Sequence, residues 1–314
     1  MVKSKFILML LLFALVAGCG GNGTVEQEEA VEPVDLSIAA AEGVAVLPLL
    51  VAREMELFLD QGIRVELIKA GGVENPEIYL CSGAADGALS DLFSLIRLQE
   101  QGFFVMATSL SGADYLLAAA PEKSGSFAAL HNVPVALSDD LNELYLLEKL
   151  LREHELDLTA VQLAIASRPE DALAAYLDER AAAAFLPRHL AAQALAAGAV
   201  VMGGGEEEKP AAGVILFTGE ALQQKEDQIA AFYRAYSAAV RRLNEGLVDF
   251  NLLPLAEWGL QALLEGEHAI ACPEAEAVSR DAFLDALNWY MAHEQLETRP
   301  VVYEGAVWQN RILE

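Results

Sequence analysis

Short apolar runs alternate with amphipathic stretches from about residue 35 onwards. In the first part of the chain, "IRVELIKA" has apolar positions with a period of two, whereas "LPLLVAREMELFLDQG" fits a helix that stops at Gly62. The pattern predicts strands at 34–41, 63–70, 86–90 and 103–110, and helices at 47–62, 75–85 and 91–102. Strands that alternate with helices in this way are typical of a parallel sheet covered by helices.

The pattern repeats in the second part of the chain. A strong amphipathic helix is predicted at 140–156, and Pro169 opens another at 169–179. The other predicted elements are strands at 115–121, 133–138, 161–167, 181–187, 199–202 and 213–219, and helices at 188–198, 225–246, 254–265 and 279–295. About 280 residues exceed what one core usually fills, so two α/β lobes and a helical C-terminal region are expected.

The N-terminus resembles a bacterial export signal. Lys3 and Lys5 precede an apolar run over 6–16, which is too short for a transmembrane helix but long enough for a signal peptide. The sequence "LVAGC" resembles the lipobox, in which the cysteine is acylated, by palmitate or a similar chain. We therefore expect a signal peptide over 1–18, lipid attachment at Cys19, and a flexible acidic tether over 19–34. An ordinary secretory signal that contains a cysteine is the alternative.

The net charge of the chain limits the classes of partner that we expect it to bind. The formal net charge is −27, which disfavours nucleic acid and anionic lipid surfaces, so we expect membrane contact only through the N-terminal lipid. The body would then lie outside the cytoplasm, in the cell envelope. Beyond Cys19, only Cys81 and Cys272 remain; they could pair in an oxidising compartment or stay unpaired. The histidines show no metal-ligand spacing, and we expect neither metal nor cofactor.

Several stretches in order resemble the substrate-binding proteins of ABC transporters for nitrate, sulfonates and thiamine pyrimidine precursors. They include "LPLLVAREMELFLDQGIRVELI", "SGAADGALSDLFSLIRLQEQG" and "LNWYMAHEQLETRPVVYEGAV". The resemblance implies a two-lobed type II periplasmic-binding-protein fold, each lobe a mainly parallel sheet flanked by helices. Residues 35–110 and 213–314 would form lobe 1, and residues 111–212 lobe 2. It also implies a monomer that captures a sulfonate, a nitrate-like anion or a heterocyclic vitamin precursor for an ABC permease.

In parallel α/β sheets, ligands bind beyond the carboxyl ends of the strands, where helix N-termini offer N–H donors. This rule gives candidates in both lobes. Those of lobe 1 are Gly43, Val46, Leu47, Ser90, Asp91, Ser109, Ser111 and Gly112; those of lobe 2 are Ser138, Asp139, Asp140, Asn142, Arg188 and His189. The Ser and Asp residues could instead serve only as helix N-caps. Arg188 and His189 follow a predicted buried strand and could contact an anionic or hydrogen-bond-accepting part of a ligand.

Three functions remain open at this point. The first is a solute receptor for an ABC importer, with no catalytic residues. The second is an enzyme, because relatives on this fold include a pyrimidine synthase; that enzyme has a cysteine-rich segment that this chain lacks. The third is a surface or signalling lipoprotein with a degenerate cleft.

Overall fold

The computed structural model describes residues 33–71, 75–112, 115–204, 213–262, 272–309 and 313. The expected signal peptide, Cys19 and most of the tether lie outside these residues. Residues 34–314 form one compact unit. Among the described residues, no helix combines the length and apolar character needed to cross a lipid bilayer.

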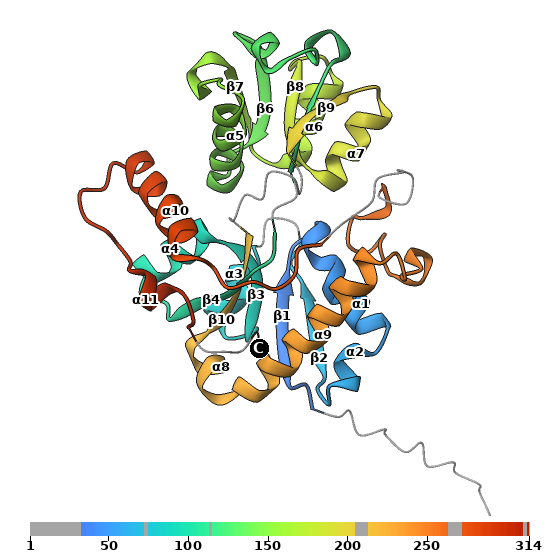
Figure 1. Ribbon diagram of the computed structural model, residues 1–314, viewed down its shortest axis with the longest axis vertical. Helices are drawn as coiled ribbons and strands as arrows, with labels where there is room; N and C mark the ends of the chain where they lie inside the picture. Colours follow the sequence, from blue (N-terminus) through green and yellow to red (C-terminus); the bar gives the residue numbers. More distant parts are fainter. Residues whose placement is uncertain are drawn as a thin grey trace, which may run out of the picture. The chain divides into compact units, whose positions relative to one another are not determined.

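The first sheet has five strands, and the last of them in the sequence lies between two earlier ones (Figure 1). In sheet order the strands are β2 (Val65–Lys69), β1 (Leu36–Ala40), β3 (Gly87–Asp91), β10 (Gly213–Thr218) and β4 (Val105–Leu110). β1 pairs in parallel with β2 and β3, whereas β10 runs antiparallel to both β3 and β4. Four strands therefore share one direction, which confirms the predicted mainly parallel sheet.

The second sheet repeats this arrangement. In sheet order its strands are β7 (Gln162–Ala166), β6 (Pro134–Ser138), β8 (Ala183–Pro187), β5 (Tyr115–Ala119) and β9 (Val200–Gly204). β6 is parallel to β7 and β8, and β5 is antiparallel to β8 and β9. In each sheet, the antiparallel strand is the first one formed after the chain leaves the other sheet.

The first connection between the sheets, which leaves β4 at Ser111, contacts the start of β10. The Ser111 N–H donates a 3.0 Å hydrogen bond to the Gly213 carbonyl. A Cβ atom at Gly213 would overlap the carbonyl oxygen of Gly112, and Gly112 itself has a φ of 76°. Glycine at both positions thus lets the first connection pass against the start of β10 without a side chain between them.

Helices cover the faces of both sheets and form three apolar cores. In β1, Leu36 and Ile38 face one core and Ala39 faces another, which explains why the strand reads as a continuous apolar run. The helices are α1 (Leu47–Glu54), α2 (Leu57–Asp60), α3 (Pro76–Ser82), α4 (Leu92–Glu100), α5 (Leu141–Glu153), α6 (Pro169–Leu177), α7 (Arg188–Ala196), α8 (Gly219–Gln224), α9 (Glu226–Asn244), α10 (Arg280–His293) and α11 (Tyr303–Ala306).

One core joins the two sheets. It contains Leu117 and Leu137 from the second sheet together with Phe93 from α4 and Leu287 from α10. α10, drawn in red in Figure 1, packs against α4. The Trp289 indole N–H donates a 2.8 Å hydrogen bond to Glu148 on α5, so the C-terminal region contacts helices that follow strands of both sheets.

Two helix predictions are wrong in part. The predicted helix 47–62 is broken because Glu56 has a left-handed φ of 56°; the break turns α2 so that Phe58 stacks on Phe232 of α9, with 5.7 Å between ring centroids. The predicted helix 254–265 is a series of turns as far as residue 262, because Gly259 has a φ of 67°, which a helix cannot continue. Cys81 is exposed and Cys272 buried, and no disulfide joins them.

Candidate functional site

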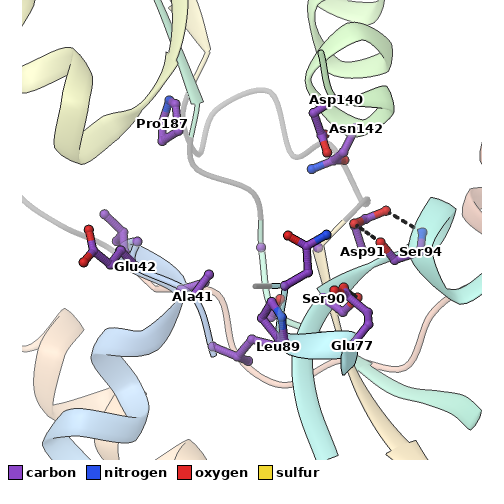
Figure 2. A pocket seen from close by; sticks show the side chains of 18 of the residues that line it. Ala41, Glu42, Glu77, Leu89, Ser90, Asp91, Ser94, Asp140, Asn142 and Pro187 are labelled. Carbon is purple, nitrogen blue, oxygen red and sulfur yellow. Dashed lines mark hydrogen bonds between the residues drawn. The ribbon is translucent and has the colours of Figure 1, made fainter. Parts of the chain in front are cut away.

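A cavity of about 260 Å³ opens where segments from both sheets meet (Figure 2). Ser90 and Asp91 line it at the carboxyl end of β3, and Asp140 and Asn142 line it just after β6. Gly112, from the first connection, and Gly213, at the start of β10, also line the cavity. The volume is near the lower end for small-molecule sites.

Asp91 caps α4 and lines the cavity at the same time. Its Oδ1 accepts hydrogen bonds from the backbone N–H groups of Phe93 (2.7 Å) and Ser94 (2.9 Å), and its Oδ2 accepts one from the Ser94 hydroxyl (2.8 Å). Burial, then the negative charges of Asp140 and Glu77, raises the pKa of Asp91 to about 7 despite these bonds. The carboxyl group is thus poised to change its charge near neutral pH.

Asp140 occupies the corresponding position at the start of α5. Its Oδ1 accepts a 3.1 Å hydrogen bond from the Glu143 N–H, and the Glu143 carboxylate accepts a 2.8 Å bond from the Ser138 N–H. Burial raises the pKa of Glu143 to about 7, although the hydrogen bonds from Ser138 act in the opposite direction. These contacts fix the turn that carries Asp140 and Asn142 toward the cavity.

Asn142 has a buried acceptor atom without a partner. The residue is 8% exposed, and its Oδ1 receives no hydrogen bond from the described protein atoms. Figure 2 shows Asn142 beside Asp140, both extending from α5 toward the space above Asp91. An unpaired buried carbonyl costs about 1–3 kcal/mol, so this position favours a molecule that can donate a hydrogen bond.

Charged side chains in the lining are mainly acidic. Glu42 and Pro187 lie across the cavity from Asp91 and Asn142 (Figure 2). The acidic residues of the described lining are Glu42, Glu77, Asp91 and Asp140, and the basic one is Arg97, whose side chain is exposed. Ser90 donates a hydrogen bond to Glu77, which holds the Glu77 carboxylate near the carboxyl end of β3.

The structure brings some of the predicted site residues together at the cavity. Those in its lining are Gly43, Ser90, Asp91, Ser111, Gly112, Asp140 and Asn142. The remaining candidates lie outside the lining. They are Val46, Leu47, Ser109, Ser138, Asp139, Arg188 and His189.

Packing explains why most of these candidates lie outside the cavity lining. Val46 and Leu47 are fully buried in a core, and the Ser109 hydroxyl lies 3.0 Å from that of Tyr233. His189 is 7% exposed and lies next to Arg188, which follows the cavity residue Pro187 directly. Burial lowers the pKa of His189, while Glu42 and Glu170 act in the opposite direction.

Several lining residues were not predicted. Glu42 directly precedes the candidate Gly43, and Tyr115 follows the first connection between the sheets. Asn75 and Glu77 belong to the start of α3, which also follows a parallel strand, so the strand-end rule could have indicated them. Among the described residues, no group of three His, Cys, Asp or Glu side chains is arranged to hold a metal ion.

Comparison with known families gives one match that covers most of the chain. The family model described as NMT1/THI5 like matches residues 44–245. No curated protein matches the sequence significantly.

Solved structures similar to this chain cover nearly its whole described length. The periplasmic aliphatic sulphonate binding protein SsuA from Escherichia coli has 18% identity and a TM-score of 0.71, over 89% of this chain and 93% of that one. The ligand binding component of an ABC-type import system from Staphylococcus aureus, with zinc bound, has 15% identity and a TM-score of 0.69, over 88% and 97%. The desulfurization enzyme DszB has 13% identity and a TM-score of 0.61, over 88% and 97%. At these identities the likeness shows the fold, which binding proteins and an enzyme share.

Proposed function

Because the chain belongs to the NMT1/THI5-like family, we propose that it captures a small solute in the cavity between its two sheets and delivers it to an ABC importer. The observation that carries the proposal is the lining itself, which combines the ends of β3 and β6 with Gly112 of the first connection and Gly213 at the start of β10. A solute there would touch both halves of the molecule at once. The roles of the solved relatives from Escherichia coli and Staphylococcus aureus, a sulphonate binding protein and a component of an ABC-type import system, support this function.

We further propose that residues 35–110 with 213–314 form one lobe and residues 111–212 the other. Gly112 and Gly213 lie where the chain passes between the sheets, and both line the cavity. A small rotation about the contact between Gly112 and Gly213 would close the lobes on a solute, as hinges do in periplasmic binding proteins. The permease would then recognise the closed form.

The cell-envelope location is part of the same proposal. In it, Cys19 carries the lipid, residues 1–18 are removed, and the folded body stands outside the cytoplasm as a monomer. A tethered receptor stays close to its permease, which shortens the path of the captured solute.

A thermal-shift screen of the full-length chain in detergent tests solute capture. The panel contains alkanesulfonates, nitrate, aminopyrimidines and primary amines. A solute that binds only the folded state adds about 2.7 kcal/mol to the free energy of unfolding at a hundredfold excess over Kd. If the solute is captured without conversion, mass spectrometry should recover the bound compound unchanged, whereas a converted product would favour an enzyme. The absence of stabilisation by any compound of the panel would overturn solute capture.

A further inference from the structure

The charges of the cavity lining do not match an anionic solute such as the one that the sulphonate-binding relative from Escherichia coli suggests. An anion commonly binds at a helix N-terminus, where unpaired N–H groups and the helix dipole attract negative charge. In this chain, α4 and α5 both point such ends at the cavity, yet Asp91 accepts the N–H groups of Phe93 and Ser94, and Asp140 accepts that of Glu143. The protein's own carboxylates thus occupy the positions at the N-termini of α4 and α5 where an anion would bind.

Two further features of the described lining favour a solute with hydrogen-bond donors and positive charge. Glu42 and Glu77 add two further carboxylates to the described lining, against the single exposed guanidinium of Arg97. Asn142 offers a buried Oδ1 that lacks a hydrogen-bond donor. A sulfonate or nitrate would bring more acceptors and more negative charge to a site that already has an excess of both.

We propose that the captured solute is an organic cation with N–H donors, such as an ammonium or amidinium compound, held by Asp140 and Asn142. The proposal rests on solute capture and names the class of solute. The charged group lies between Asp140 and the acidic side chains of Asp91 and Glu77, and one of its N–H groups donates to Asn142 Oδ1. Burial and then the charges of Asp140 and Glu77 raise the pKa of Asp91, and a cation beside these carboxylates would offset the second of these causes.

Matched pairs of probes distinguish a cation site from an anion site. We would measure the melting temperature of the full-length chain in low salt with propylammonium against propanesulfonate, and with benzamidinium against benzenesulfonate. Nitrate and a neutral aminopyrimidine complete the series. We expect at least one of the two cations to raise the melting temperature and neither sulfonate to do so.

Two variants connect the effect to named side chains. Asp140→Asn removes the charge but keeps a residue that caps helices equally well, so the protein should fold normally and bind the cation about tenfold more weakly. Asp157→Asn is the matched control, because Asp157 also caps a short helix, at Thr159, but lies exposed and outside the cavity. Asn142→Leu removes the acceptor and should weaken binding without loss of folding.

The outcomes separate this proposal from solute capture. Stabilisation by a sulfonate, by nitrate or by the neutral aminopyrimidine, but by neither cation, overturns the cation site and leaves solute capture standing. Equal stabilisation by cations of wild type, Asp140→Asn and Asn142→Leu overturns the assigned residues. If none of the probes in the series shifts the melting temperature, both proposals fail.

Discussion

The Tyr145 hydroxyl donates a 2.7 Å hydrogen bond to Asp285 Oδ2, which joins α5, after β6 of the second sheet, to α10 near the end of the chain. Lys149, one turn along α5, lies 3.1 Å from the same oxygen. Beneath these polar contacts, the Phe93 ring meets the edges of Tyr145 and Trp289 at centroid distances of 5.2 and 5.3 Å. Three helices distant in the sequence thus share one aromatic cluster beside the cavity.

Phe93→Ala should destabilise the protein by about 3–5 kcal/mol, because it opens a void among fully packed rings. Urea denaturation followed by tryptophan fluorescence measures the change, since Trp289 lies in the cluster. Phe104→Ala is the matched control: its ring is 57% exposed, so the loss should be much smaller. Equal losses in the two variants would contradict the role assigned to the cluster.

Gly213→Ala should lower the free energy of unfolding by about 1–3 kcal/mol. The new methyl group would overlap the Gly112 carbonyl, where the start of β10 contacts the first connection. Solute affinity should also fall, since the displaced backbone lines the cavity. Gly125→Ala is the control, because Gly125 has open space where a Cβ would stand. Thermal unfolding with and without the solute measures both effects, and a Gly213→Ala protein as stable as Gly125→Ala would contradict the close approach.

Stability should fall as the pH rises from 5 to 8. The pKa values of Asp91 and Glu143 are raised to about 7, so the folded protein holds protons that the unfolded chain releases from about pH 4 upwards. The stability that Asp91 and Glu143 contribute is fully present below the pKa values of these groups in the unfolded chain, and it is lost as the pH rises through about 7. Asp91→Asn should therefore flatten the pH profile of the free energy of unfolding. Asp157→Asn should not, because the pKa of Asp157 is lowered and its titration lies below this range.

Affinity for a cationic solute should rise from pH 6 to pH 8. Deprotonation of Asp91 adds a negative charge to a lining that already contains Glu42, Glu77 and Asp140, with Arg97 at an exposed position. Other titratable groups near the lining are Glu143, Tyr115, whose pKa is raised by burial and the neighbouring carboxylates, and His189, whose pKa is lowered by burial. Calorimetric titration with benzamidinium, which stays protonated throughout, measures the trend. An affinity independent of pH would contradict the contribution of Asp91.

Cys19→Ala should release the folded protein from the membrane fraction and leave its melting temperature unchanged. The expected lipid is attached to this side chain, whereas the acidic body is repelled by anionic headgroups. Fractionation of cells followed by immunoblotting measures the distribution. Retention of the variant on the membrane would contradict the lipobox interpretation.

The amino-acid pattern predicts the central strands well because they are buried on both faces, as in the Leu36–Ala40 run, whereas β2 is indicated by its alternating apolar and polar positions. It does not reveal that Glu56 and Gly259 interrupt helical patterns, since a left-handed residue is selected there by packing that local periodicity does not record. The sequence indicates Asp91 and Asp140 as site residues, because each lies at the end of a predicted strand and aspartate is a common helix N-cap. The inclusion of Glu42 and Tyr115 depends on contacts between distant segments, which a single sequence does not supply.

The position of β10 has a consequence for synthesis on the ribosome. Asp91 pairs with Gly213, and every strand of the second sheet lies between them in the sequence. The second sheet can therefore close as soon as residue 204 has emerged, whereas the facing edges of β3 and β4 stay unpaired until residue 218 follows. The half of the protein that is translated first is thus completed last. Its open strand edges are the places where a nascent chain would depend most on protection from aggregation.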